Sequence, residues 1–186
     1  MLFRSPYDFK AAYSHPDRPL EVDIGSGKGR FLTARSGRFP EINFLGIERQ
    51  LIRINSSGRR CERAGRDNVR LFRMEGYYAI SQMMPERYVA AYYFFFPDPW
   101  PKARHEDQRL FKPLFMDALH RTLEEGGLLH VASDHLPYFD EIAALLTKDP
   151  RFEETETFEP DDAERTDFEL IFSHKRIGRC SYRKRP

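Results

Sequence analysis

Short apolar runs alternate regularly with stretches of helical pattern along this chain. Five runs of strand length, each bounded by proline, glycine or charged residues, lie at 19–25, 42–48, 68–74, 88–96 and 127–133. The helical patterns lie around 28–37, 50–65, 107–123 and 136–148. Strands separated by helices pair in parallel, and right-handed crossovers place the helices on both faces of the sheet. We therefore expect an α/β fold with a doubly wound, Rossmann-like, mostly parallel sheet.

The pattern changes after residue 150. Two strand-like runs lie near 152–158 and 167–174, and no helix-length apolar pattern separates them. This arrangement predicts an antiparallel hairpin at the C-terminal end of the sheet. The 186 residues suit one compact domain with a single core. We expect one domain over residues 1–186.

Composition excludes several classes of protein. Hydrophobic residues make up 40% of the chain, but no window approaches the ~18 apolar residues that a membrane helix needs. The first residues, "MLFRSPYDFKAAYSHPDRP", lack the apolar core of a signal peptide. Cys61 and Cys180 belong to no metal-ligand spacing, and neither do the six histidines. We expect a cytoplasmic protein without a metal ion.

The charges are unevenly distributed although the net charge is only +1. Residues 49–73 hold eight arginines, and the last twelve residues hold six further basic side chains. Residues 153–169 hold nine acids and a single basic side chain, Arg165. Basic clusters of this kind bind polyanions such as RNA, but they also occur on solvated helix faces. Both interpretations remain open for each cluster.

A glycine-rich turn follows the first predicted strand. The segment "VDIGSGKGRF" places Gly25, Gly27 and Gly29 where a strand leads into a helix, and glycine there lets a ligand approach the backbone. The phosphate-binding loop GxxxxGK[ST] does not fit, and Arg30 occupies the last position of the dinucleotide pattern GxGxxG. A looser GxGxG loop remains, preceded by Asp23.

Carboxylates end the first four predicted strands. Asp23, Glu48, Glu75 and Asp98 should meet at the sheet edge where open α/β sheets bind ligands. Glu48 has the position of an acid that binds a ribose diol. Four acids suit a cationic ligand, and S-adenosylmethionine carries an ammonium and a sulfonium group. Each acid taken singly is also compatible with helix capping.

The segment "YYFFFPDPWPKARH" ends the fourth strand with a turn fixed by prolines. Such a turn can hold Asp98 toward S-adenosylmethionine, the methyl donor. It can also present Trp100 as a surface on which a base stacks. Lys102 and Arg104 follow it, with Arg109 on the next helix, and these cations could hold phosphates. The turn therefore predicts acceptor recognition.

The segment "FPDPWPKARH" also resembles the signature of the tRNA (guanine-N7)-methyltransferases. Further matches are "RPLEVDIGSGKGRFL", "FLGIE", "NVRL", "SDHLPYF", "TDFEL" and "GRCSYR", so the resemblance covers about 165 residues. It implies transfer of a methyl group from S-adenosylmethionine to N7 of a guanosine in the tRNA variable loop. The implied donor contacts are Asp23, Glu48, Glu75 and Asp98, beside the glycines Gly25 and Gly27. The implied catalytic residue is Asp98, and the implied substrate contacts are Lys102, Asp134, Thr166 and Glu169, to which the basic run adds Arg104.

The chain departs from that family in three places. Asp23 stands where the family usually has glutamate, and Glu75 with Gly76 replaces aspartate or asparagine followed by alanine. Glu106 and Asp107 interrupt a run that is commonly more basic. The segment before the first strand is also short, about 18 residues. We expect these changes to alter the reach of two carboxylates and to weaken tRNA binding.

Methylation of guanine N7 releases no proton, so the predicted reaction needs no general base. Two alternatives remain. An amino-group methyltransferase acting on adenine N6 or glutamine uses D/N-P-P-Y/F/W after the fourth strand, from which Asp98, Pro99 and Trp100 omit one proline. A non-catalytic RNA-binding relative is the other. A nicotinamide oxidoreductase is disfavoured by the failed GxGxxG pattern. We expect tRNA as the partner and a monomer or a homodimer.

Overall fold

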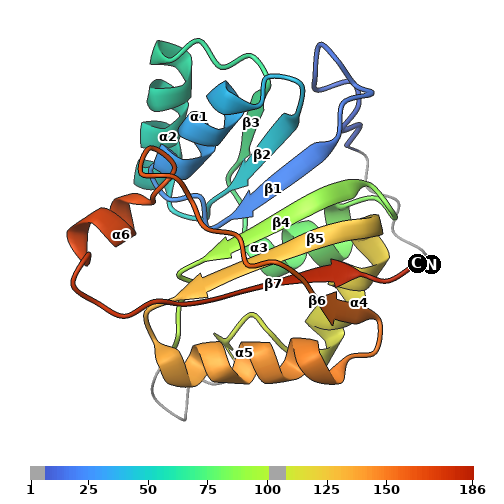
Figure 1. Cartoon of the computed structure of the whole chain (residues 1–186). Coiled ribbons are helices and arrows are strands. Elements are labelled where there is room, and N and C mark those ends of the chain that lie inside the picture. The colour runs from blue at the N-terminus through green and yellow to red at the C-terminus, as the bar shows by residue number, and fades with distance from the viewer. Residues whose placement is uncertain (1–6, 101–107) are drawn as a thin grey trace.

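The computed structural model describes residues 7–100 and 108–186, and the described part contains one seven-stranded sheet. The strand order is β3-β2-β1-β4-β5-β7-β6 (Figure 1). The first five strands pair in parallel, and β7 is antiparallel to both of its neighbours. The bounds are β1 Leu20–Ile24, β2 Asn43–Ile47, β3 Val69–Phe72, β4 Val89–Phe95, β5 Leu123–Ser133, β6 Phe152–Glu154 and β7 Gly178–Lys184. The predicted α/β, mostly parallel sheet is confirmed.

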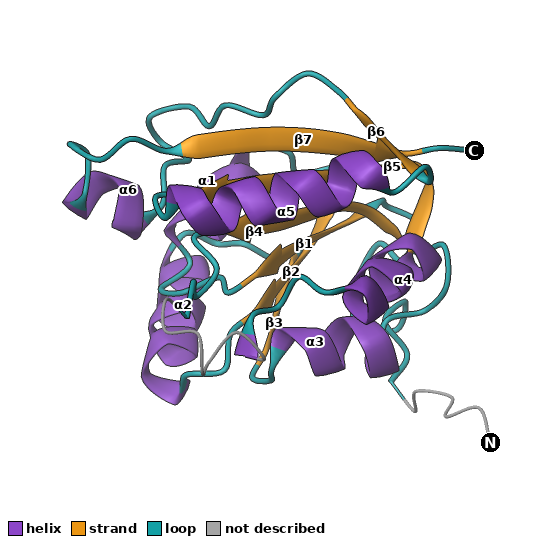
Figure 2. Cartoon of the chain, turned by 90° about the horizontal axis from the view of Figure 1, so that it is seen from below, coloured by secondary structure: helices purple, strands orange, loops and turns teal. Residues whose placement is uncertain are grey.

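Helices cover both faces of this sheet (Figures 1 and 2). One face carries α1 and α2, and the other carries α3, α4 and α5, with a π-helical turn, η1, after α3. A short helix, α6, lies beyond the carboxyl ends of the strands. The bounds are α1 Arg30–Arg38, α2 Leu51–Arg63, α3 Gly76–Tyr78, η1 Ala79–Met83, α4 Pro113–Thr122, α5 Leu136–Lys148 and α6 Asp167–Ile171. None of the helices in this described part of the chain is long and apolar enough to span a membrane.

The aromatic residues of β4 pack against the helices on both faces of the sheet. Tyr92 and Phe94 point to one face and join the large core cluster that includes Phe115 of α4. Tyr93 and Phe95 point to the other face and pack with Phe31 of α1. A central strand is covered on both faces, and this explains why consecutive residues of β4 are apolar instead of alternating with polar ones.

The C-terminal part corrects one prediction. A short strand begins at Phe152, as expected. The prediction of a strand at 167–174 is wrong, because Asp167–Ile171 forms α6. Thr166 accepts a hydrogen bond from the Glu169 amide, and the Glu169 carboxylate accepts one from the Thr166 amide. This capping box starts a helix. The antiparallel partner of β6 is β7, which inserts between β6 and β5.

Residues 155–166, which we call the acidic strap, cross the face of the sheet that carries α1 (Figure 1). Phe158 anchors the strap among Phe31, Tyr93 and Phe95. Arg35 contacts the strap residue Glu164 at 3.6 Å, and further ion pairs join Arg38 to Asp161 and Arg179 to Glu159. Basic residues of the same chain therefore offset much of the negative charge of the strap.

The strand order reverses between β1 and β4. From β1 the chain proceeds outward through β2 to β3, and it then returns to the other side of β1 with β4 and β5. Open α/β sheets bind their ligands at such a switch point, outside the carboxyl ends of the strands. The fold therefore places the glycine loop after β1 and the proline turn after β4 at the expected ligand site.

Candidate active site

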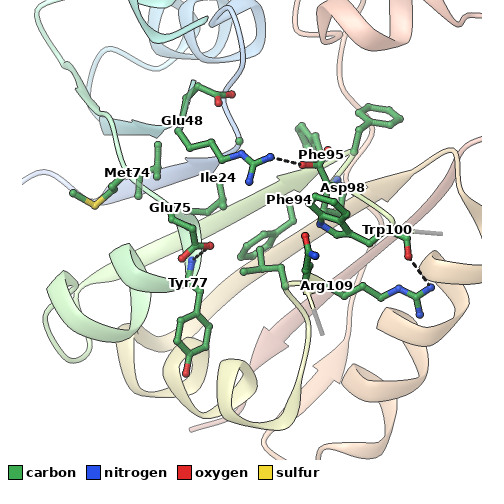
Figure 3. Close-up of a pocket in the computed structure, with 18 of the residues that line it drawn as sticks. Ile24, Glu48, Met74, Glu75, Tyr77, Phe94, Phe95, Asp98, Trp100 and Arg109 are labelled. Carbon is green, nitrogen blue, oxygen red and sulfur yellow. Dashed lines mark hydrogen bonds and ion pairs between the residues drawn. The ribbon is translucent and has the colours of Figure 1, made fainter. Parts of the chain in front are cut away.

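A pocket of about 760 Å³ opens at the carboxyl ends of β1, β2 and β4 (Figure 3). Its size lies within the usual range of small-molecule sites, which is about 300–1,000 Å³. Glu48, Glu75 and Asp98 line it, together with Gly25 and Trp100. The structure thus brings three of the four predicted carboxylates to one pocket.

The glycine loop after β1 has the backbone that the sequence predicted. Gly25, Gly27 and Gly29 have φ angles of 80°, 57° and 75°, which favour glycine. The Gly25 amide donates to the Ile47 carbonyl at 2.8 Å. The Gly27 amide donates to the Glu48 carboxylate at 3.2 Å, so that the end of β2 holds the loop in place.

Asp23 is the most deeply buried of the four acids, with 4% of its surface exposed. It belongs to β1 and is not among the residues that line the pocket. Burial, together with the negative charge of Glu48, raises the pKa of the Asp23 carboxyl to about 7. The free protein therefore holds a carboxyl group that is close to losing its proton at neutral pH, beside the glycine loop.

This raised pKa predicts how the stability of the free protein depends on pH. Between pH 4 and 7 the folded state keeps the Asp23 proton and the unfolded state does not, so the free energy of unfolding should fall by a few kcal/mol as pH rises. Urea unfolding at pH 5 and pH 8 measures this decrease. Asp23→Asn, which does not titrate, should lose less stability over the same interval. Parallel behaviour of both proteins would contradict the assignment.

Glu48 lies at the end of β2 and is also buried. Its second carboxylate oxygen accepts a hydrogen bond from the Gln50 amide at 2.8 Å. The two backbone donors, Gly27 and Gln50, fix the carboxylate at the rim of the pocket. Carboxylate oxygens have further lone pairs, so hydroxyl groups of a ligand can still donate to Glu48.

Glu75 is exposed and caps α3. Its two carboxylate oxygens accept hydrogen bonds from the Tyr77 and Tyr78 amides, each at 2.8 Å. Helix capping, which the sequence left open as an alternative, is thus the interaction that the structure contains. The carboxylate remains at the pocket (Figure 3).

Asp98 lies in a strained turn after β4. The nonglycine residues Phe96 and Trp100 have positive φ angles of 57° and 42°, and strain of this kind is often found at functional sites. Arg109 stabilises the turn by donating to the Pro99 carbonyl at 3.0 Å. The Asp98 side chain is 67% exposed, and one of its oxygens lies 3.6 Å from Arg49. The turn therefore holds an accessible carboxylate at the pocket.

Arg109 lines the pocket, whereas its predicted contact with phosphates remains a prediction. It also donates to Glu141 at 2.7 Å and lies over the ring of Tyr138, so it ties the proline turn to α5. Tyr138 is 1% exposed and belongs to the core. No short sequence pattern identifies such a contact, because Arg109 and Glu141 are far apart in the chain.

The predicted substrate residues divide into two groups. Lys102 and Arg104 lie outside the described residues. Asp134, Thr166 and Glu169 are described and do not line the pocket. Asp134 pairs with Lys175 at 2.5 Å, and Glu169 is buried and pairs with Arg179. Their predicted role remains a prediction.

Helix α6 nevertheless lies next to the pocket. Phe168 of α6 packs on Phe96 with ring centroids 4.6 Å apart, and Phe96 lines the pocket. Asp167 pairs with Arg60 of α2 at 3.2 Å. Helix α6, which begins with the capping box, therefore packs against a residue of the pocket lining.

Sequence reasoning missed Arg49 and Arg53 as pocket residues. They belong to the arginine-rich segment 49–73, and their position directly after the acid of β2 was the available signal. Among the residues that the structure describes, no group of three or more His, Cys, Asp or Glu side chains could hold a metal ion.

Comparison with known proteins identifies relatives along most of the chain. A family model described as "Putative methyltransferase" matches residues 17–175. The chain is 38% identical over 132 residues to a tRNA (guanine-N(7)-)-methyltransferase of Nocardia farcinica, which corresponds to 71% of this chain and 49% of that protein. It is 37% identical over 144 residues to a protein of the same name from Syntrophotalea carbinolica, which corresponds to 77% and 62%.

Solved structures with the same fold are more distant in sequence. An rRNA methylase from Streptococcus thermophilus superposes with a TM-score of 0.59 at 14% identity, over 91% of this chain and 89% of that chain. A SAM-dependent O-methyltransferase from Thermotoga maritima gives a TM-score of 0.59 at 19% identity, over 90% and 60%. The sheet is thus the one found in these methyltransferases. The chain spans only 49% to 62% of the length of the two curated relatives above.

Proposed function

We propose, since this chain belongs to the methyltransferase family whose model matches residues 17–175, that it transfers a methyl group from S-adenosylmethionine to N7 of a guanosine in tRNA. The observation that carries the proposal is the meeting of Glu48, Glu75 and Asp98 at one pocket below a glycine loop. The names of the curated relatives support the same acceptor.

The residues of the pocket fit S-adenosylmethionine. When bound, this donor supplies a methyl group on a positively charged sulfur. Glu48 would accept hydrogen bonds from the ribose hydroxyls, and Gly25 and Gly27 would let the donor approach the backbone. Asp23, whose carboxyl is raised in pKa to about 7 by burial, would ionise more readily beside a cationic group. Glu75 and Asp98 would complete a negatively charged lining.

Asp98 and Trp100 would recognise the acceptor guanine. The Asp98 carboxylate would accept hydrogen bonds from N1 and N2 of the base, and Trp100 would offer a stacking surface. N7 has a free lone pair and loses no proton, so the residues of this chain have to position the base and offset its developing positive charge. Because the major groove of RNA is narrow, the target must lie in a loop, and we propose the tRNA variable loop.

The remaining contacts would hold the RNA around that guanosine. Lys102 and Arg104 would bind phosphates. Asp134, Thr166 and Glu169 would reach the acceptor from α6 and the end of β5. A tRNA substrate also implies that the protein acts in the cytoplasm.

A substitution in the capping box separates a structural role from a substrate role. Thr166→Ala removes one capping hydrogen bond, and we expect a loss of about 1 kcal/mol in the free energy of unfolding. If Thr166 also contacts tRNA, the KM for tRNA should rise at a temperature where the variant is fully folded. An unchanged KM would leave Thr166 with the capping role alone. Urea unfolding and steady-state kinetics measure the two effects.

Methyl transfer from labelled S-adenosylmethionine to bulk tRNA tests the proposal directly. We expect 7-methylguanosine after nuclease digestion, and we expect it to disappear when the guanosine of the variable loop is changed to adenosine. Label in adenosine or in a protein would instead indicate an amino-group methyltransferase. Donor binding without any transfer would indicate a non-catalytic relative.

A further inference from the structure

Arg49 joins the two sides of the pocket. It follows Glu48 directly, and its backbone carbonyl accepts a hydrogen bond from Arg73 at 3.4 Å. Its side chain is 55% exposed, and one guanidinium nitrogen lies 3.6 Å from the Asp98 carboxylate. The dashed line that ends at Asp98 in Figure 3 marks this ion pair.

The ion pair spans the end of β1. Strands β2 and β4 are the two hydrogen-bonded neighbours of β1, so their axes lie about 10 Å apart. Arg49 follows β2 and Asp98 follows β4, whereas Gly25 follows β1 between them. A donor that lies on the glycine loop and reaches Asp98 must therefore share this space with the Arg49 side chain.

Arg49 can leave Asp98 easily. Both side chains are more than half exposed, and ion pairs between exposed groups contribute little to stability because water and salt screen them. Arg73 contacts the backbone carbonyl of Arg49 and not its guanidinium, so this contact does not hold the Arg49 side chain at Asp98.

The proposed reaction changes the charge of the acceptor. The N7 lone pair forms the new bond to the methyl carbon, and the electrons of the broken carbon–sulfur bond go to sulfur. No proton is released, so the donor leaves as a neutral thioether and the guanine becomes a cation. Asp98 attracts that cation after the reaction as it does during the reaction. Product that is held by this attraction would leave slowly.

We propose that Arg49 is a positioning residue for product release, an inference that rests on the proposed function. Arg49 points away from Asp98 while donor and guanosine occupy the pocket. It returns to Asp98 as the methylated guanosine leaves, and it thereby supplies the positive charge that the departing product removes.

The variant Arg49→Ala tests this role. Asp98 then lacks the Arg49 charge, and we expect methylated tRNA to inhibit the variant at about fivefold lower concentration than the unaltered protein. Steady-state turnover should fall by a similar factor. The single-turnover rate of methyl transfer should change less than twofold, so that a burst of product precedes the steady state. Rapid-quench kinetics with labelled donor measure both rates.

Three further variants control for other effects. Arg59→Ala removes an equal charge from an exposed position of α2 that does not line the pocket, and it should show no burst. Arg49→Lys keeps a cation and should restore product release. Adding Arg49→Ala to Asp98→Asn should change the affinity for methylated tRNA no further, because Arg49 acts through Asp98.

Two results would overturn the inference. A single-turnover rate in Arg49→Ala that falls as much as steady-state turnover would place Arg49 in donor binding or in the chemical step. If Arg49→Ala and Arg59→Ala change the kinetics equally, the effect of Arg49 is only a general electrostatic attraction for RNA. If the unaltered protein makes no 7-methylguanosine, the proposed function fails and the role of Arg49 fails with it.

Discussion

Replacing Asp98 with asparagine should lower the turnover of tRNA methylation by about 10²–10³-fold. Asparagine keeps the shape of the side chain but not the charge that offsets the cation formed on guanine. Donor affinity should weaken less than tenfold, because Glu48 and the glycine loop are unchanged. Single-turnover methyl transfer and calorimetric titration of S-adenosylmethionine measure the two quantities.

The exposure of Asp98 and a matched control variant make this experiment decisive. The Asp98 side chain is 67% exposed, so its replacement should leave the free energy of unfolding unchanged. Asp140→Asn, at an exposed position of α5 outside the pocket, removes the same charge and should retain full turnover. Turnover of Asp98→Asn equal to that of the unaltered protein would exclude Asp98 from the mechanism.

Gly29→Ala should destabilise the fold by more than about 3 kcal/mol and abolish tight donor binding. Gly29 has a φ angle of 75°, which an alanine adopts only with strain. An added methyl group would also lie 2.8 Å from the Ser57 Cβ atom and 3.0 Å from its Cα atom. Helices α1 and α2 would have to separate, and the loop between β1 and α1 would move with them. Urea unfolding and donor titration measure the effects.

Gly65 provides the matched control. It has a similar φ angle of 64°, but no atom lies within 4 Å of an added methyl group, and it is not part of the pocket. Gly65→Ala should therefore cost only the backbone strain, about 1–2 kcal/mol, and leave donor binding intact. Ser57→Gly in the Gly29→Ala protein should restore part of the stability. Equal losses in the two alanine variants would show that the clash with Ser57 contributes nothing.

The uneven distribution of charge along the sequence is explained by ion pairs in the structure. The sequence alone did not explain how the acidic segment 153–169 would avoid repelling RNA. In the structure Glu164 and Asp161 of the strap contact Arg35 and Arg38 of α1. The strap therefore lies against basic residues on the α1 face, while Arg49 and Arg53 line the pocket at the strand ends. The acids of the strap do not line this pocket, where RNA would bind.

The local sequence determined the main architecture. Apolar runs of strand length, helical periods between them and glycines at the first turn predicted the parallel sheet and the loop of Gly25, Gly27 and Gly29. These features depend on neighbouring residues, through backbone preferences and the burial of continuous apolar segments. The sequence also predicted that the acids at the strand ends meet, because parallel strands end at the same edge of a sheet. The motifs of the resemblance supplied the reaction, which no periodicity could have predicted.

Only the tertiary structure decided how these side chains are engaged. The run at 167–174 suggested a strand, and sequence reasoning did not use Thr166 and Glu169 as a capping box. Helix α6 forms because this capping box and the contact of Phe168 with Phe96 favour a helix. Arg109 lines the pocket and stabilises the proline turn by donating to the Pro99 carbonyl. Arg49 reaches Asp98 across β1 because the strand order reverses there. Such contacts join residues that are distant in the chain, so they depend on the packing of the whole sheet and not on any local pattern.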